Sequence, residues 1–354
     1  MASQCGELVV ATPASTSSGN RSAVYSSSGG LFFYDVAADK SEVLDNASSP
    51  FGLVPRFRTA SQISYVRLRE RGDPQHLYGQ DSFFEFDLES SKSIELLRLP
   101  NHVMGYDWSP DGRRLAYQLR VEQADEVAPV ALCMFDTDAT TVSFLRPLNP
   151  PIGTGTGQRE ETAVTWSPGG RAILLVDTAE SPSLQVVSED GVNLIDARDA
   201  TFGRWLGEER LIFQEDPHTD QVAAWRTLTT QSGATRAFKM PDRAYRPALS
   251  PDGSLIAFDD GDGDQPSIYI FDLATQTSRR LVRGYVAPVW LRSNLLAVSA
   301  AAPCSGGFCT VPWIARGGTM AVNVQTGERH SINLETTLQD LYRYGVIDLS
   351  GPPN

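Results

Sequence analysis

The feature that most constrains the fold of this chain is a short motif that recurs along it. A tryptophan or leucine is followed by Ser-Pro-Asp-Gly or Ser-Pro-Gly-Gly and then by an apolar run, at residues 107–117, 165–175 and 249–258. Proline sets φ for a turn, aspartate bonds the local backbone, and glycine takes the positive φ that reverses the chain. Each copy therefore predicts a β-hairpin.

Weaker copies extend the repeat over most of the chain. Segments 55–66, 204–213 and 289–298 keep only the apolar skeleton of the hairpin. A second signature follows, a β-branched and aromatic run that ends in aspartate, at 83–87, 132–136 and 268–272, and segment 31–35 matches it without a preceding turn motif. Such runs are typical of buried strands followed by a turn and a shorter fourth strand.

Four strands per unit, repeated about every 40–60 residues without helical periodicity, are the pattern of a propeller blade. The sequence predicts an all-β fold: a β-propeller of four-stranded antiparallel blades in a single domain over 1–354, with 1–7 a disordered N-terminal segment or linker. Seven blades are expected, with six and eight as alternatives. Strands from the two termini close the ring, the missing one coming from 344–349 or from 8–10, so that no sheet edge stays open.

Composition narrows the class of partner. The net charge of −13 disfavours general nucleic-acid binding, because the surface repels a phosphate backbone. No apolar run approaches the roughly 18–20 residues of a membrane-spanning helix, so no transmembrane segment is predicted.

The four cysteines suggest an oxidising environment. Cys304 and Cys309 enclose a glycine-rich turn, short enough for a disulfide, which would place the chain in an oxidising compartment. Two free thiols are the alternative. Cys133 lies in an apolar run and is expected in the core. Cys5 is a candidate for the lipid anchor of a bacterial lipoprotein, although Gln4 before it is a poor residue for cleavage.

The Trp-Ser-Pro-Asp-Gly hairpin followed by an aromatic-Asp strand resembles the WD40-like Pro-Asp (PD40) repeats of TolB-type propellers. Related repeats occur in the propellers of prolyl oligopeptidase-family enzymes and of oligogalacturonate lyases. The match covers most of the chain and is strong in the copies at Trp108, Trp166 and Leu249. The resemblance implies a periplasmic or extracellular, cell-envelope-associated bacterial protein that binds a partner.

The longest insertions fall between the second and third strands or between blades, at 69–81, 121–129, 149–161, 215–221, 259–267 and 300–318. These connections share one face of a propeller, so that face is the predicted binding surface for a protein or glycan. Tolerated insertion without function is the alternative. The candidate binding residues on this face are His76, Asp216, His218, Asp220, Phe308 and Trp313. Trp313 could instead fold back over its blade.

One loop is a candidate metal site. Asp260, Asp262 and Asp264 alternate with glycines and could wrap a Ca²⁺ ion, which takes six to eight oxygen ligands. A solvated acidic loop without metal is the alternative, and no other cofactor is expected.

A non-catalytic binding propeller is the preferred function. The chain has no Gly-x-Ser-x-Gly nucleophile motif, and its histidines, His76, His102, His218 and His330, are far apart in sequence. The alternative is a metal-assisted polysaccharide lyase or hydrolase, which would need at least three metal-ligating side chains to converge from several blades.

Overall fold

The computed structural model describes residues 5, 7–8, 23–27, 30–35, 40–45, 55–70, 80–120, 130–148, 163–177, 183–198, 200–215, 224–238, 240–241, 244–260, 265–303, 313–332 and 347–348. Within these ranges all regular structure is β-strand and none is helix, which confirms the predicted all-β class. None of the described residues belongs to a helix that could span a membrane. The described strands form seven antiparallel sheets, and the fold is a β-propeller. The number of blades in the ring stays a prediction.

The chain divides by its internal contacts into two compact units. Unit 1 comprises residues 1–19, 49–238 and 353–354, and unit 2 comprises residues 20–48 and 239–352. A single domain over 1–354 stays a prediction, and the units are described separately.

Unit 1 contains four consecutive blades. The first has β5 (Arg56–Phe57), β6 (Gln62–Glu70), β7 (Gln80–Asp87) and β8 (Lys92–Arg98). The second has β9 (Val103–Trp108), β10 (Arg114–Arg120), β11 (Val130–Asp136) and β12 (Thr141–Leu148). The third has β13 (Ala163–Trp166), β14 (Ala172–Asp177), β15 (Ser183–Ser188) and β16 (Asn193–Arg198). The fourth has β17 (Ala200–Trp205), β18 (Arg210–Glu215), β19 (Trp225–Thr229) and β20 (Thr235–Phe238).

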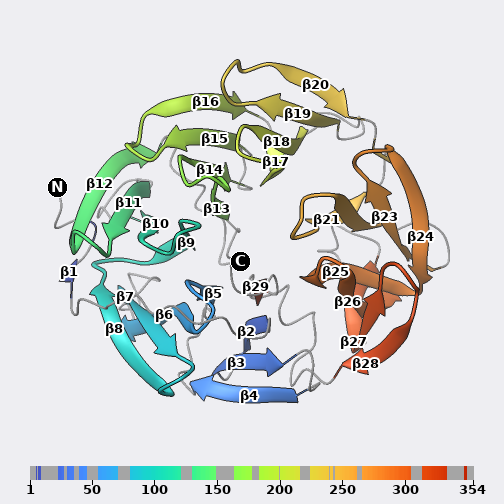
Figure 1. The fold of residues 1–354 in the computed structure, drawn as a ribbon, viewed down its shortest axis with the longest axis horizontal. Helices are drawn as coiled ribbons and strands as arrows, with labels where there is room; N and C mark the ends of the chain where they lie inside the picture. The colour runs from blue at the N-terminus through green and yellow to red at the C-terminus, as the bar shows by residue number, and fades with distance from the viewer. Residues whose placement is uncertain are drawn as a thin grey trace. The chain divides into compact units, whose positions relative to one another are not determined.

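Each blade is a meander in which strands adjacent in sequence pair with one another. In unit 1 the blades fan out from their first strands to their fourth strands (Figure 1). Apolar side chains fill the space between blades: Ala116, Leu132 and Met134 of the second blade pack against Val164 and Trp166 of the third. The core therefore lies between successive sheets, as the radial repeat predicts.

Unit 2 contains two further blades and a third sheet. One blade has β21 (Tyr245–Leu249), β22 (Leu255–Asp259), β23 (Ser267–Asp272) and β24 (Thr277–Arg283). The next has β25 (Tyr285–Arg292), β26 (Leu295–Pro303), β27 (Trp313–Asn323) and β28 (Arg329–Ile332). The third sheet joins β2 (Ala23–Ser27), β3 (Gly30–Asp35) and β4 (Lys40–Asp45) to the C-terminal strand β29 (Ile347–Asp348).

Residues from both ends of the sequence share this third sheet. Val24 lies opposite Asp348 and Tyr25 opposite Ile347, so the missing strand comes from the C-terminal run. The alternative source, 8–10, is wrong, because Leu8 belongs to β1 (Glu7–Leu8), which pairs with β8 at the edge of the first blade of unit 1. Within the segment 1–7 the structure describes Cys5, which is buried, and Glu7 of β1, and the expectation of disorder for that segment stays a prediction.

The hairpin turns have the predicted chemistry, with serine as an additional acceptor. In the second blade the Gly112 N–H donates to the Ser109 carbonyl at 2.8 Å, and Gly112 has a positive φ of 67°. The Ser109 hydroxyl donates to Asp111 at 2.5 Å and accepts the Arg114 N–H at 2.9 Å. This closed network explains why the motif forms a tight turn wherever it recurs.

Candidate binding face

The two ends of the blades differ in the length of their connections. First and second strands are joined by 58–61, 109–113, 167–171, 206–209, 250–254 and 293–294, and we call this the short-turn end. Second and third strands are joined by 71–79, 121–129, 178–182, 216–224, 260–266 and 304–312, and we call this the long-loop end. The exception is the sheet with β2 and β3, where 28–29 suffice. Most of the predicted insertions therefore do fall at one end of each blade.

One predicted loop is largely strand. β26 continues to Pro303 and β27 begins at Trp313, with Ala301 opposite Ala315 and Pro303 opposite Trp313. These two strands form a long arm at the long-loop end of their blade. Trp313 is half-buried and packs against that blade's apolar cluster, and its role in binding stays a prediction.

A buried ion pair supports this arm. Asp259, the last residue of β22, is fully buried, and its carboxylate accepts two hydrogen bonds from Arg246, each 2.8 Å long. The remaining side of the Arg246 guanidinium reaches the Trp313 carbonyl at 3.1 Å. The Ala287 N–H donates to Asp259 at 3.2 Å, so one carboxylate joins two neighbouring blades of unit 2.

The backbone around this pair is strained. Arg246 and Ala287 both have a positive φ, of 47° and 60°, in the left-handed region that costs non-glycine residues about 1–2 kcal/mol. Each lies where the strand register shifts, between Tyr245 and Ala248 and between Val286 and Val289. Strain of this kind persists only where surrounding contacts hold it, and it concentrates at functional sites.

Charge burial dominates the electrostatics of the pair. Desolvation raises the pKa of Asp259 above its usual value, and the hydrogen bonds and charge of Arg246 oppose this. The Arg246 side chain is 16% exposed, whereas that of Asp259 is 0% exposed. The guanidinium is thus the polar group of this pair that solvent can reach.

Unit 1 has a buried carboxylate at the long-loop end of its first blade. Asp81 contacts His102 Nδ1 at 2.7 Å and accepts the Val103 N–H at 2.9 Å, both residues lying at the start of the second blade. Asp81 and His102 are almost completely buried. Carboxylates at this end therefore fix the entry of the chain into the following blade in both units.

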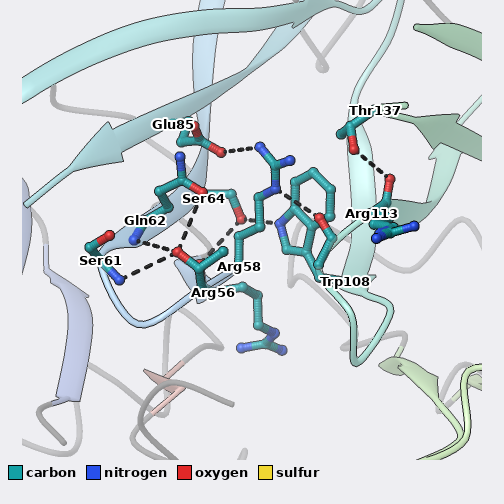
Figure 2. A network of polar contacts seen from close by, with 11 residues as sticks. Arg56, Arg58, Ser61, Gln62, Ser64, Glu85, Trp108, Arg113 and Thr137 are labelled. Atoms are coloured by element: carbon teal, nitrogen blue, oxygen red, sulfur yellow. Dashed lines mark hydrogen bonds and ion pairs between the residues drawn. The ribbon is translucent and has the colours of Figure 1, made fainter. Parts of the chain in front are cut away.

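At the short-turn end, the first and second blades of unit 1 are joined by a different network, which the sequence did not predict (Figure 2). Arg58 is buried, donates to Glu85 at 2.7 Å and to the Gly112 carbonyl at 2.8 Å, and lies 4.8 Å from the centre of the Trp108 ring. Burial raises the pKa of Glu85, and Arg58 opposes that shift. These contacts join residues of the first and second blades, so we regard the network as a structural joint between the two blades.

The predicted site residues are only partly described. His76, Asp216, His218, Asp220, Phe308, Asp262, Asp264, Cys304 and Cys309 lie outside the described residues. Asp260 is described, and its Oδ1 accepts the Ser267 N–H at 2.9 Å, which ties the ends of β22 and β23 together. In the part of the chain that the structure describes, no three His, Cys, Asp or Glu residues are grouped as metal ligands. The calcium site stays a prediction.

The structure joins two cysteines that the sequence analysis did not pair. Cys5 and Cys133 form a disulfide across a sequence separation of 128. Cys133 is in the core as predicted, but it is not a free thiol. The lipid anchor at Cys5 is not supported, because its sulfur is bonded to Cys133. The pair Cys304–Cys309 stays a prediction.

No protein-family model and no curated protein matches the chain. Solved structures do. The periplasmic gluconolactonase PpgL of Pseudomonas aeruginosa is 15% identical, with a TM-score of 0.54 over 94% of this chain and 98% of that one. The β-propeller domain of the Trilobed protease of Pyrococcus furiosus is 13% identical, with a TM-score of 0.51 over 80% and 95%.

TolB from Acinetobacter baumannii is 15% identical, with a TM-score of 0.46 over 89% of this chain and 79% of that one. The two neighbours with TM-scores above 0.5, the gluconolactonase and the protease domain, share the fold of this chain.

Proposed function

We propose that this chain is a non-catalytic propeller of the cell envelope that binds a protein partner at the long-loop end of its blades. The difference between the two ends carries the proposal. The described short turns at one end are closed by their own hydrogen bonds, whereas the other end has long connections and the arm of β26 and β27. Loops held by a rigid scaffold are where binding residues concentrate.

Two further observations support the location. A disulfide between Cys5 and Cys133 is stable in an oxidising compartment such as the periplasm. A structural neighbour, the gluconolactonase, is itself described as periplasmic. The net charge of −13 favours a partner with a basic surface, because complementary charge accelerates encounter.

The test places the same new charge at the two ends of one strand. Pro303 and Asn294 are both exposed, Pro303 ending β26 at the long-loop end and Asn294 preceding β26 at the short-turn end. Tagged wild type, Pro303→Glu and Asn294→Glu are incubated with an extract of the host's own envelope, and captured proteins are quantified. Circular dichroism melts verify that both variants are folded.

The proposal predicts one protein that wild type and Asn294→Glu capture equally and that Pro303→Glu captures at least about 10-fold less, corresponding to about 1.4 kcal/mol. Equal capture by all three proteins, or a loss confined to Asn294→Glu, would contradict it. Cleavage of polysaccharide by the purified chain would favour the metal-assisted lyase or hydrolase instead.

A further inference from the structure

The first described residues of the chain bridge two neighbouring blades of unit 1. Cys5 is bonded to Cys133 in β11 of the second blade. Immediately afterwards β1 adds a fifth strand to the first blade, with Glu7 opposite Arg98 and Leu8 opposite Leu97. We call Cys5, Glu7 and Leu8 the N-terminal clasp. It is attached to one blade by a covalent bond and to the other by strand pairing.

A buried hydroxyl also anchors the clasp. Tyr117, in β10, donates a hydrogen bond from its hydroxyl to the Cys5 carbonyl, and this tyrosine is completely buried. Burial raises its pKa, so the hydroxyl stays a donor at ordinary pH. The Tyr117 ring packs edge-on against the Phe83 ring of the first blade, with 5.3 Å between the ring centroids. The clasp therefore lies over a junction to which both blades contribute.

Both cysteines are completely buried. Thiol–disulfide exchange needs a thiolate to reach one sulfur of the bond, so a reductant cannot attack while the clasp is seated. The rate of reduction should therefore depend on how often the clasp lifts. If reduction needs only local opening of the clasp, its rate should respond to substitutions that contact the clasp. If reduction needs global unfolding of the unit, its rate should respond to any substitution that destabilises the unit.

We propose that the N-terminal clasp is a redox-controlled device that locks two blades together when oxidised and releases β1 from the edge of β8 when reduced. A dithiol is the reductant. One of its thiolates attacks a sulfur of the Cys5–Cys133 bond and forms a mixed disulfide, and the other cysteine leaves as a thiolate. The second dithiol sulfur then displaces the first cysteine. The dithiol loses two electrons and two protons, and both cysteines become thiols.

Two conservative tyrosine substitutions test whether the clasp opens locally. Tyr117→Phe removes only the hydroxyl that bonds Cys5. Tyr106→Phe is the matched control, because Tyr106 is also buried, also meets Phe83 edge-on, and donates to the Ser64 carbonyl away from the clasp. The readout is the rate at which dithiothreitol reduces the disulfide of the full chain in native buffer, followed by alkylation and mass spectrometry.

Loss of one net hydrogen bond should make Tyr117→Phe react roughly 2- to 12-fold faster than wild type, with Tyr106→Phe unchanged. Equal acceleration of both variants would mean that reduction needs unfolding of the unit, and no acceleration of either would mean that the hydroxyl does not hold the clasp. Both results overturn the proposal.

A second measurement follows the released strand. In the double variant Cys5→Ala/Cys133→Ala, amide hydrogen exchange at Arg98 in β8 should accelerate by at least about 10-fold, while β14 in the third blade keeps its wild-type protection. Because a long loop is no longer closed, Tm should fall by about 10 °C. Unchanged exchange in β8 would show that β1 stays bound without the disulfide and would refute the redox control.

Discussion

Arg58 occupies the position that serine occupies in the regular hairpins. Its N–H donates to the Gln62 carbonyl across the turn, just as the Ser109 N–H donates to the Arg114 carbonyl in the next blade. The Arg58 side chain then reaches across the junction to the Gly112 carbonyl. At the residue scale, the turn sequence sets the hairpin, and long side chains connect it to the neighbouring blade.

Two glycines with the same turn geometry separate these effects. Gly112 and Gly253 have φ of 67° and 69°. A Cβ added to Gly112 would lie 2.8 Å from the Arg58 carbonyl oxygen, whereas a Cβ added to Gly253 would have no atom within 4 Å. Gly253→Ala should cost about 1 kcal/mol from backbone strain alone. Gly112→Ala should cost about 3 kcal/mol, because the backbone at Arg58 must also move. Urea unfolding measures both, and equal costs would mean that Arg58 is not fixed at the junction.

The Arg246–Asp259 pair predicts a pH-dependent defect. Arg246→Ala leaves a buried carboxylate unpaired, so it should destabilise the protein by about 3 kcal/mol at pH 7. The pKa of Asp259, already raised by burial, then rises further. A raised pKa in the native state means that folding favours the protonated carboxyl. The loss of stability in Arg246→Ala should therefore shrink as pH falls toward 3.8, the pKa of Asp259 in the unfolded chain.

Thermal melts between pH 7 and about pH 4 check this, with the exposed Arg280→Ala on β24 as a control that should show no such trend. A defect that stays constant with pH would exclude Asp259 as its cause.

At the scale of elements, tryptophan links successive first strands. The indole N–H of Trp166 donates to the Asp107 carbonyl at 3.1 Å, that of Trp205 to Thr165 at 3.1 Å, and that of Trp290 to Ala248 at 2.9 Å. These tryptophans were recognised from the sequence as repeat markers. Their partners were not, because each lies about a blade away in sequence, and the hairpin pattern contains no information on contacts between blades.

The junction between the first and second blades of unit 1 departs from this rule. Trp108 donates to the Ser64 hydroxyl at 2.7 Å, and that hydroxyl in turn donates to the Arg56 carbonyl at 3.3 Å (Figure 2). Ser64 thus bridges the tryptophan and the first-strand carbonyl, which hydrogen-bond directly to each other at the junctions described above. Because segment 55–66 keeps least of the repeat, sequence comparison alone could not reveal this substitution.

The turn carboxylates predict an acid-sensitive contribution from each hairpin. Partial burial raises the pKa of Asp252, but hydrogen bonds from Ser250 and Ser254 outweigh it and hold the pKa below 3.8. A lowered native pKa stabilises the fold above the unfolded pKa, and the stabilisation is lost as pH falls. Asp252→Ala should therefore cost more stability at pH 7, where the carboxylate accepts these bonds, than at about pH 3, below the unfolded pKa. Chemical denaturation at the two pH values checks this, and an equal cost at both would contradict the assignment.

At the scale of the whole molecule, the fold class followed from the sequence, while the long-range links did not. Proline and glycine at fixed positions specify turns locally, which is why the hairpins were predictable. The need to close the ring made the C-terminal run one of two expected sources of the missing strand. The disulfide of Cys5 was missed, because short spacing favoured Cys304 with Cys309 and pairing cannot be deduced from spacing over 128 residues. The hydrogen bond from Arg246 to the Trp313 carbonyl was missed for the same reason, because the two residues are far apart in sequence.

Photo-cross-linking in the native host is the direct test of whether a partner binds at the long-loop end. A photoreactive residue is placed at Pro303 or, as the control, at Asn294, the two exposed positions at opposite ends of β26. We expect a discrete cross-linked protein from position 303 and none from position 294. A cross-link from position 294 alone, or from neither position, would contradict it.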